Sequence, residues 1–245
     1  FTGGSAVKVA AQRTVEQGKQ LAAEALEAPA ADIEYRAGRY HVAGTDLGID
    51  LAALAGRQAG QRIFVDSTST VAGPTWPNGC HVCEVEIDPG TGQVEVVAYA
   101  SVNDIGRVVS PAIVRGQIDG GAVQGIGQAL CERIVYDRDS GQLQSASFMD
   151  YALPHADIVR HFKTLFDTSI PSLNNELGVK GVGELGTIGA VPAVVNAVVD
   201  ALAHAGLGRD AEKVQMPLTG EMVWRALKRD FPAPLFASTM QVPHS

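Results

Sequence analysis

The sequence has few cysteines, few basic residues and no long uninterrupted apolar run. Only Cys80, Cys83 and Cys131 occur among its 245 residues, too few for a disulfide framework, and this favours a reducing compartment such as the cytoplasm. Lys and Arg number 19 against 27 Asp and Glu, for a net charge of -8. No basic cluster is present to neutralise phosphates, so nucleic acid is not an expected partner.

The most apolar stretch, residues 190–207, lacks the continuity of a membrane span. Pro192, Asn196, Asp200 and His204 interrupt it, whereas a span needs about 20 predominantly apolar residues. We predict a core helix here, with Asn196, Asp200 and His204 on a solvated or interface face. What the chain does have is a hydrophobic fraction of 46%, which is enough for a packed core.

The clearest local pattern is a β-hairpin. The residues CHVCEVEID alternate in polarity, DPGTG supplies a turn, and 94–102 returns as a second strand. Residues three apart on a strand point to opposite faces, so Cys80 and Cys83 cannot bind one metal together. The sequence therefore predicts no metal site held by protein side chains.

The remaining patterns predict an α+β chain with mixed sheets and packed helices, in two lobes. A helix is expected from Ser5, as its cap, to about Leu26, a small hairpin at 33–42 around Gly38, and helical turns at 50–55. Turn-forming residues fill 66–79 and suggest a lobe boundary there. The predicted division is 1–73, 74–230 and a C-terminal segment, 231–245, that is either an extended arm or a disordered tail.

A glycine-rich helix follows Ser110-Pro111. The run GQIDGGAVQGIGQAL carries interior glycines, each costing the helix up to about 1 kcal/mol relative to alanine. Either a neighbouring element packs tightly on this backbone, or a bulky ligand lies along it with Gln117, Gln124 and Gln128 offering amide groups.

The run GVGELG at 181–186 matches the dinucleotide-binding fingerprint literally. That fingerprint must join a strand that ends at its first glycine to a helix that starts beside it. The preceding SIPSLNNELGV is turn-like, and the best predicted helix start is Pro192. The sequence therefore disfavours an NAD-binding oxidoreductase.

What remains is a glycine loop that presents one carboxylate, Glu184. Leu185, Ile188 and Val191 predict apolar surroundings, which favour a general base working near neutral pH. The alternative is that Glu184 has a local structural role, either as a cap or in a salt bridge for which Lys180 is a candidate partner. The residues alone leave both interpretations open.

Several segments together resemble a known family. The runs KGVGELGTIGAVPAVVNAVVDAL, GQIDGGAVQGIGQALCE and MPLTGEMVWRAL, with GGSAV, HVCEVEID, VNDIGRVVSP and SFMDYALP in the same order, resemble the C-terminal part of the molybdenum-binding large subunit of the molybdenum hydroxylases. That family includes xanthine dehydrogenase, carbon monoxide dehydrogenase and aldehyde oxidoreductases. The resemblance extends over nearly the whole chain.

The resemblance implies roles for individual residues. Glu184 would be the general base, which takes a proton from the water that supplies the oxygen. Gln117 would contact a molybdenum–molybdopterin cofactor in its cytosine dinucleotide form, and Lys180, Gly181, Val182 and Gly183 would line that cofactor. The reaction would hydroxylate an electrophilic carbon of a small molecule, such as an N-heterocycle, a purine or an aldehyde, or would oxidise carbon monoxide.

The resemblance also implies partners. Members of the family have several hundred residues ahead of this region, so we expect this chain to be catalytically incomplete by itself and to need the N-terminal half of the molybdenum subunit. Electrons would pass to iron–sulfur clusters and FAD on partner subunits. The alternative is a non-catalytic homologue or assembly domain of the same fold.

Overall fold

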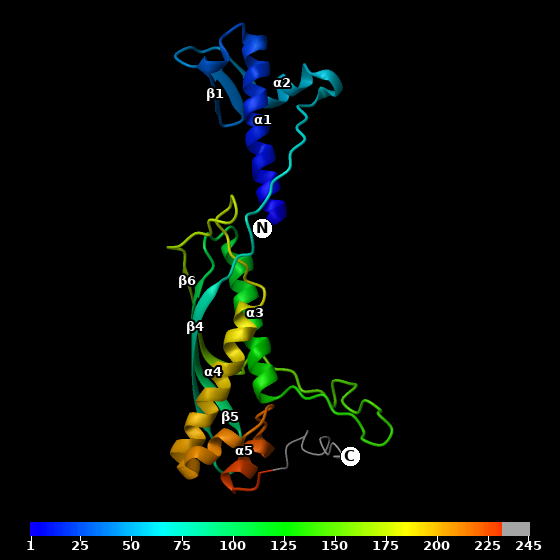
Figure 1. Ribbon diagram of the computed structural model, residues 1–245, viewed down its shortest axis with the longest axis vertical. Coiled ribbons are helices and arrows are strands. Elements are labelled where there is room, and N and C mark those ends of the chain that lie inside the picture. The colour runs from blue at the N-terminus through cyan, green and yellow to red at the C-terminus, as the bar shows by residue number, and fades with distance from the viewer. Residues whose placement is uncertain (232–245) are drawn as a thin grey trace, which may run out of the picture. The chain divides into compact units, whose positions relative to one another are not determined.

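The computed structural model describes residues 1–231 and contains two compact units. The smaller unit comprises 1–75 and 172–179, and the larger comprises 76–171 and the chain from Lys180 onward. Each unit has a three-stranded sheet and its own helices (Figure 1), so the predicted α+β class is confirmed. The segment 172–179 differs from the predicted division, which assigns it to the second lobe. The arm predicted at 231–245 lies outside the described residues, except for Phe231.

The smaller unit packs one long helix against an antiparallel sheet. Its elements are α1 (Thr2–Leu26), a 3₁₀ turn (Ala30–Asp32), β1 (Ile33–Arg36), β2 (Arg39–Val42), β3 (Gly48–Asp50), α2 (Leu51–Gly56) and a second 3₁₀ turn (Ala59–Gln61). The predicted hairpin is confirmed, and Ala37 and Gly38 turn it with φ of 50° and 81°. The core is formed by Ala22, Ile33, Tyr40, Val42, Ile49 and Leu54.

The predicted cap at Ser5 is wrong. Helix α1 begins at Thr2, and the Ser5 N–H donates to Phe1 O at 2.9 Å, so the helical hydrogen bonding starts one turn earlier. Ser5 is buried, and its hydroxyl has no hydrogen-bond partner among residues 1–231. The serine therefore packs inside the helix instead of capping it.

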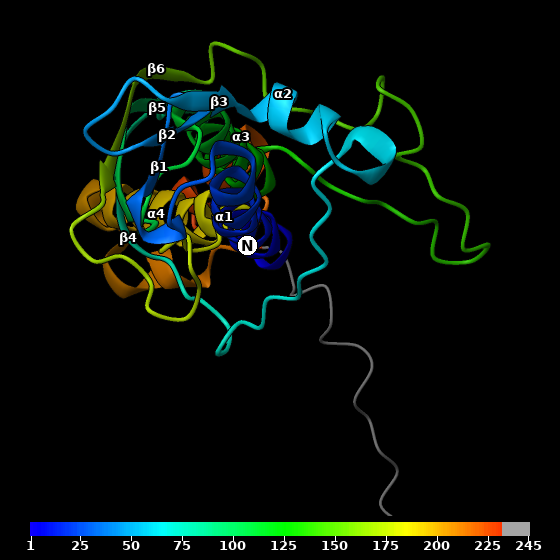
Figure 2. The ribbon, with the colours of Figure 1, turned by 90° about the horizontal axis from the view of Figure 1, so that it is seen from above.

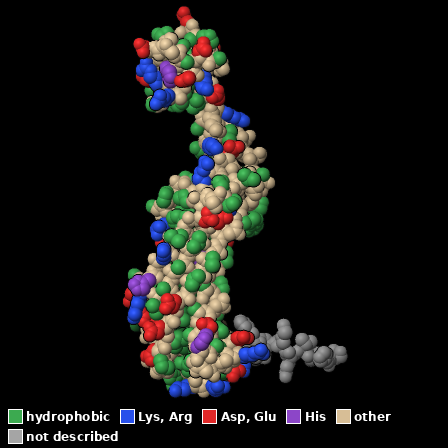
Figure 3. Space-filling model, turned by 90° about the vertical axis from the view of Figure 1, so that its left-hand side faces the viewer, with side chains coloured by type: hydrophobic (Ala, Val, Ile, Leu, Met, Phe, Trp, Pro, Cys, Tyr) green, Lys and Arg blue, Asp and Glu red, His purple; other side chains and the backbone are tan. Residues whose placement is uncertain are grey.

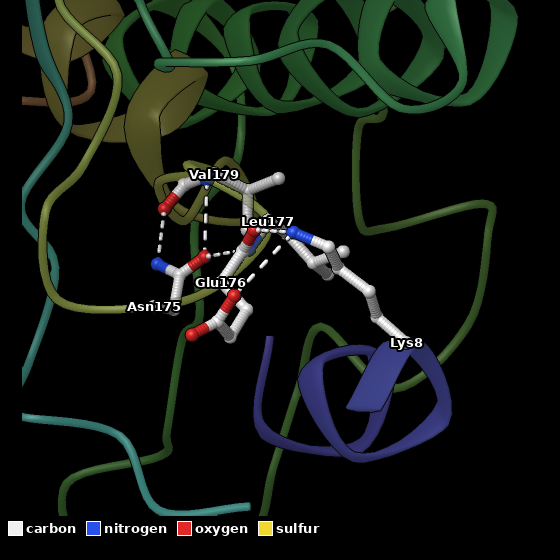
Figure 4. A network of polar contacts seen from close by, with 5 residues as sticks. All are labelled: Lys8, Asn175, Glu176, Leu177 and Val179. Carbon is white, nitrogen blue, oxygen red and sulfur yellow. Dashed lines mark hydrogen bonds and ion pairs between the residues drawn. The ribbon is translucent and has the colours of Figure 1, made fainter. Parts of the chain in front are cut away.

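The segment 172–179 is held to α1 within the smaller unit. Asn175 organises its turn, because its Oδ1 accepts from the N–H groups of Leu177 and Val179 at 3.1 and 3.2 Å (Figure 4). Lys8 of α1 donates to the Glu176 carbonyl at 2.6 Å and lies 3.4 Å from its carboxylate. These contacts fix the chain immediately before Lys180.

The larger unit is built on a sheet of order β4–β5–β6. Its elements are β4 (Asn78–Ile87), β5 (Val94–Asp104), α3 (Pro111–Leu130), β6 (Val159–Asp167), α4 (Leu185–Leu202), a π turn (Ala203–Leu207), a 3₁₀ turn (Gly208–Lys213) and α5 (Gly220–Leu227). Strands β4 and β5 form the predicted hairpin, and β6 joins β5 in parallel. Cys80 and Cys83 lie on opposite faces as predicted: Cys80 is exposed, and burial raises the pKa of the Cys83 thiol to about 11.

Helices α3 and α4 lie side by side on one face of this sheet (Figures 1 and 2). By length and composition alone, Leu185–Lys213 is apolar enough to cross a membrane. However, Ala190, Val194, Val198 and Leu202 of α4 are fully buried against the sheet and α3. The predicted core helix is therefore confirmed, and Asn196, Asp200 and His204 lie on its exposed side.

The other face of the sheet carries exposed apolar side chains. Val82, Val102 and Leu165 are 62%, 46% and 47% exposed, and hydrophobic side chains gather on this side of the larger unit (Figure 3). The helices thus cover only the face from which the candidate site is built.

Candidate functional site

The glycine loop leads directly into α4. Glu184 is the residue before the first helical residue, Leu185, and its carbonyl accepts from the Ile188 N–H at 3.0 Å. The helix start predicted at Pro192 is wrong, because Pro192 lies inside α4. Two glycines, Gly186 and Gly189, lower the helix propensity of the first turns. The packing of Gly186 on α3 and of Gly189 on His81 compensates for this cost.

Because α4 starts early, the glycine loop leads into a helix, as the dinucleotide fingerprint requires. The fingerprint also requires a strand before the loop. Among the described residues, the last strand before the loop is β6, which ends at Asp167. The chain from there to Gly181 is irregular. No strand therefore delivers the loop, as the fingerprint requires. The lack of a strand directly before Gly181 in the described chain is the feature that disfavours NAD binding.

Lys180 anchors the start of the loop. Its ammonium donates to the Asp104 carboxylate at 2.5 Å, and its N–H donates to Ile105 O at 2.9 Å. This hydrogen bond holds the pKa of Asp104 below its usual value, with a further contribution from the Gly106 N–H. The side chains of Lys180 and Asp104 are only 10% and 19% exposed. The Lys180 salt bridge is therefore made with Asp104, and the alternative pairing with Glu184 is wrong.

Glu184 itself is exposed in this chain. Ile188, which follows it on α4, is 66% exposed. The apolar enclosure predicted from Leu185, Ile188 and Val191 is therefore not formed among residues 1–231. The Glu184 carboxylate lies at the end of an anchored loop and is accessible to a ligand or a partner chain.

Four glycines of α3 fall into two pairs, while the fifth, Gly127, packs against Glu132 and Pro154. Gly121 and Gly125 face α4, where a Cβ on Gly125 would lie 2.8 Å from the Ala190 Cβ and 2.9 Å from Thr187 O. Gly116 and Gly120 are exposed, and a Cβ on either would meet no atom of the described chain within 4 Å. Tight packing thus accounts for the first pair. The second pair leaves open backbone, and a ligand along it stays a prediction.

The open glycines share their face of α3 with the amide side chains. Gln117 and Gln124 are exposed beside Gly116 and Gly120. The loop is similarly open, since a Cβ on Gly181 or Gly183 would also meet none of the described atoms within 4 Å. Both stretches present backbone that a bulky ligand can approach closely.

The packing of α3 on α4 brings these two stretches together. A Cβ on Gly186 would collide with Ile118 O and would lie 2.7 Å from Ala122 N, and Thr187 Oγ1 donates to Gly121 O at 2.9 Å. Gln117 directly precedes Ile118, and Glu184 lies two residues before Gly186. The predicted catalytic and cofactor-binding residues of both segments therefore belong to one region of the larger unit.

Sequence reasoning missed a polar network beside this region. His81 lies between the Tyr99 hydroxyl, 2.5 Å from Nδ1, and the Asn103 carbonyl oxygen, 3.3 Å from Nε2. Burial lowers the pKa of His81, although the hydrogen bond to Asn103 opposes this. The alternation along β4 and β5 could have indicated that all three residues point to the same face.

Comparisons with known proteins identify the family to which the chain belongs. Residues 1–160 match the family described as the molybdopterin cofactor-binding domain. The chain belongs to this family. The resemblance to the molybdopterin-binding subunit of molybdenum hydroxylases is thereby confirmed.

Individual members support the same assignment. The gamma subunit of the 6-hydroxypseudooxynicotine dehydrogenase complex of Paenarthrobacter nicotinovorans is 34% identical over 90% of this chain and 28% of its own length. Carbon monoxide dehydrogenase from Oligotropha carboxidovorans aligns with a TM-score of 0.78 and 29% identity, covering 92% of this chain and 28% of its own. Quinoline 2-oxidoreductase from Pseudomonas putida 86 aligns with a TM-score of 0.74 and 36% identity. The alignment covers 91% of this chain and 29% of the quinoline enzyme's chain. The chain thus spans less than a third of the length of these relatives.

Proposed function

We propose that this chain supplies the general base, Glu184, and part of the cofactor site of a molybdenum hydroxylase. The enzyme would hydroxylate an electrophilic carbon of an N-heterocycle, a purine or an aldehyde, or oxidise carbon monoxide, with oxygen derived from water. The observation that carries the proposal is the placement of one exposed carboxylate at the end of an anchored glycine loop. Membership of the molybdopterin cofactor-binding family supports it.

The described residues fit a large pterin cofactor. Gly116, Gly120, Gly181 and Gly183 leave unobstructed backbone, and Gln117 adds an amide that can both donate and accept. We assign contacts with the cofactor to Gln117, Gly181, Val182 and Gly183. Lys180 would hold the loop through Asp104 while lining the same site. A cytosine dinucleotide extension is the form of the cofactor that we propose.

The chemistry divides between the cofactor and this chain. When bound, the molybdenum cofactor supplies the two-electron oxidation of the substrate. Glu184 accepts the proton from the attacking water, and the Lys180–Asp104 pair keeps the loop that carries Glu184 in place. Proton removal by a positioned carboxylate contributes about 10²- to 10⁴-fold to a rate.

The proposal includes partners. We propose that the complete enzyme contains the remainder of the molybdenum subunit, an iron–sulfur subunit and an FAD subunit, and that it works in the cytoplasm. The relative from Paenarthrobacter nicotinovorans is named as the subunit of a complex, which supports a hetero-oligomer here.

The test is Glu184→Gln in the complete enzyme, with Glu212→Gln as the matched control. Glu212 is also exposed but lies in the turn that follows α4, away from the loop. We expect Glu184→Gln to lower kcat by at least about 100-fold with the molybdenum content unchanged, because the side chain acts as a base and not as a ligand. Full activity in this variant would contradict the proposal, and loss of molybdenum with the activity would indicate a structural role.

A further inference from the structure

A row of buried polar side chains crosses the inner face of the larger sheet. Tyr99, Ser101 and Asn103 alternate along β5, and His81 of β4 is paired with Ser101 in the strand register. The Asn103 amide nitrogen donates to Ser101 Oγ at 2.9 Å and to Leu165 O of β6 at 3.2 Å. The row therefore connects all three strands.

The network fixes His81 in one neutral form. Tyr99, Ser101 and Asn103 are 1%, 2% and 0% exposed. Because the Asn103 carbonyl oxygen can only accept, Nε2 of His81 carries the proton, and Nδ1 accepts from the Tyr99 hydroxyl. The Tyr99 ring stacks on Phe162 with centroids 5.2 Å apart. The imidazole is thus held at both nitrogens by side chains that are themselves buried.

The imidazole lies directly against the start of α4. A Cβ on Gly189 would collide with the His81 ring, and its three nearest atoms would all belong to that ring. The neighbouring Ile188 N–H donates to the carbonyl of Glu184. The ring therefore contacts the backbone of the helical turn whose hydrogen bonds begin at Glu184.

The first turns of α4 are in this way confined from two sides. On the α3 side, Gly186 lies against Ile118 O, and Thr187 donates to Gly121 O. On the β4 side, His81 fills the space that a side chain at 189 would need. If the turn moved toward α3, the α3 backbone would have to shift. If it moved toward β4, the His81 ring, which is hydrogen-bonded at both nitrogens, would have to shift.

We propose that His81, held by Tyr99 and Asn103, is a positioning residue that sets the location of the Glu184 carboxylate. This inference rests on the proposed function, since it assigns His81 an effect on catalysis through Glu184. A base must stand within hydrogen-bonding distance of its proton, and a misplacement of about 1 Å can cost about 100-fold in rate. A rigid ring under the first turn of α4 prevents such displacement.

The test uses the complete, molybdenum-loaded enzyme and two variants. Tyr99→Phe keeps the ring that stacks on Phe162 but removes the donor to His81, and Gly189→Ala pushes against the imidazole. The control is Val82→Ala, because Val82 neighbours His81 on β4 but is 62% exposed on the opposite face. For each variant, kcat, KM and molybdenum per chain are measured.

We expect kcat to fall at least about 10-fold in both variants, with KM changed by less than about twofold and the molybdenum content unchanged. Val82→Ala should match the parent enzyme. Unchanged kcat per molybdenum in Tyr99→Phe would overturn the inference, even if Gly189→Ala failed to fold. Loss of molybdenum in step with kcat would also overturn it, because the network would then serve cofactor retention.

Glu184→Gln, measured in parallel, separates this inference from the proposed function. If Glu184→Gln is inactive and Tyr99→Phe is fully active, only the positioning role of His81 fails. If Glu184→Gln is fully active, the proposed function fails, and the positioning role fails with it.

Discussion

At the scale of single residues, the site depends on which charged groups are paired. Lys180 is engaged by Asp104, and Glu184 is left exposed. The glycine loop pointed to Glu184, and the family resemblance added Lys180 as a candidate site residue. Glu184, four residues along the chain, was the wrong partner for Lys180. The actual partner, Asp104, lies 76 positions away in sequence, and only the sheet geometry brings it close.

The Lys180–Asp104 pair predicts a pH-dependent anchor. The hydrogen bond from Lys180 lowers the pKa of Asp104 in the folded state. Its stabilisation is therefore present above the unfolded carboxyl pKa of about 3.9, and it is lost as the pH falls through the lower folded pKa. Asp104→Asn should weaken the loop by about 1.5–3 kcal/mol at neutral pH, because a charged hydrogen bond is lost.

Hydrogen exchange over residues 178–190 of the complete enzyme measures this effect. Asp104→Asn should exchange faster than the parent at neutral pH, and the difference should shrink in acid below the carboxyl pKa. Asp139→Asn is the control, since Asp139 is exposed in the connection between α3 and β6. Equal exchange in Asp104→Asn and the parent at neutral pH would show that Asp104 does not anchor the loop.

At the scale of elements, the packing of α3 on α4 decides where the site lies. The hairpins were predictable because period-two alternation and turn residues are local signals. The start of α4 was not, since Gly186 and Gly189 weaken the helix signal and are explained only by the backbone and ring that they approach. For the same reason, sequence alone could not divide the α3 glycines into packed and open groups.

The two groups of glycines on α3 predict opposite effects of the same substitution. Gly125→Ala should destabilise the fold by about 1–3 kcal/mol, because the added methyl group overpacks against Ala190 and Thr187. The methyl group added by Gly120→Ala meets no neighbour in the part of the chain that the structure describes, so this substitution should stabilise α3 by up to about 1 kcal/mol. If the cofactor lies on this face, Gly120→Ala should nevertheless lower the molybdenum content.

Thermal unfolding and metal analysis of the two variants test this assignment. A higher transition temperature with less molybdenum is the expected result for Gly120→Ala. Full molybdenum content in that variant would contradict the placement of the cofactor on the open face of α3. Equal destabilisation by both substitutions would contradict the division of the glycines.

At the scale of the whole molecule, the chain supplies only some of the parts that its proposed activity needs. Within the larger unit, these parts are α3, the glycine loop and Glu184. Among residues 1–231, no group of three or more His, Cys, Asp or Glu side chains could hold a metal ion.

The most direct test of the account is the composition of the native complex that contains this chain. The complex would be purified from its source, and its molybdenum content and polypeptides determined by mass spectrometry. We predict stoichiometric molybdenum, a pterin dinucleotide, and iron–sulfur and flavin subunits. A complex without molybdenum, or this chain purified alone, would contradict the central claim and favour a non-catalytic homologue in which Glu184 has no base function.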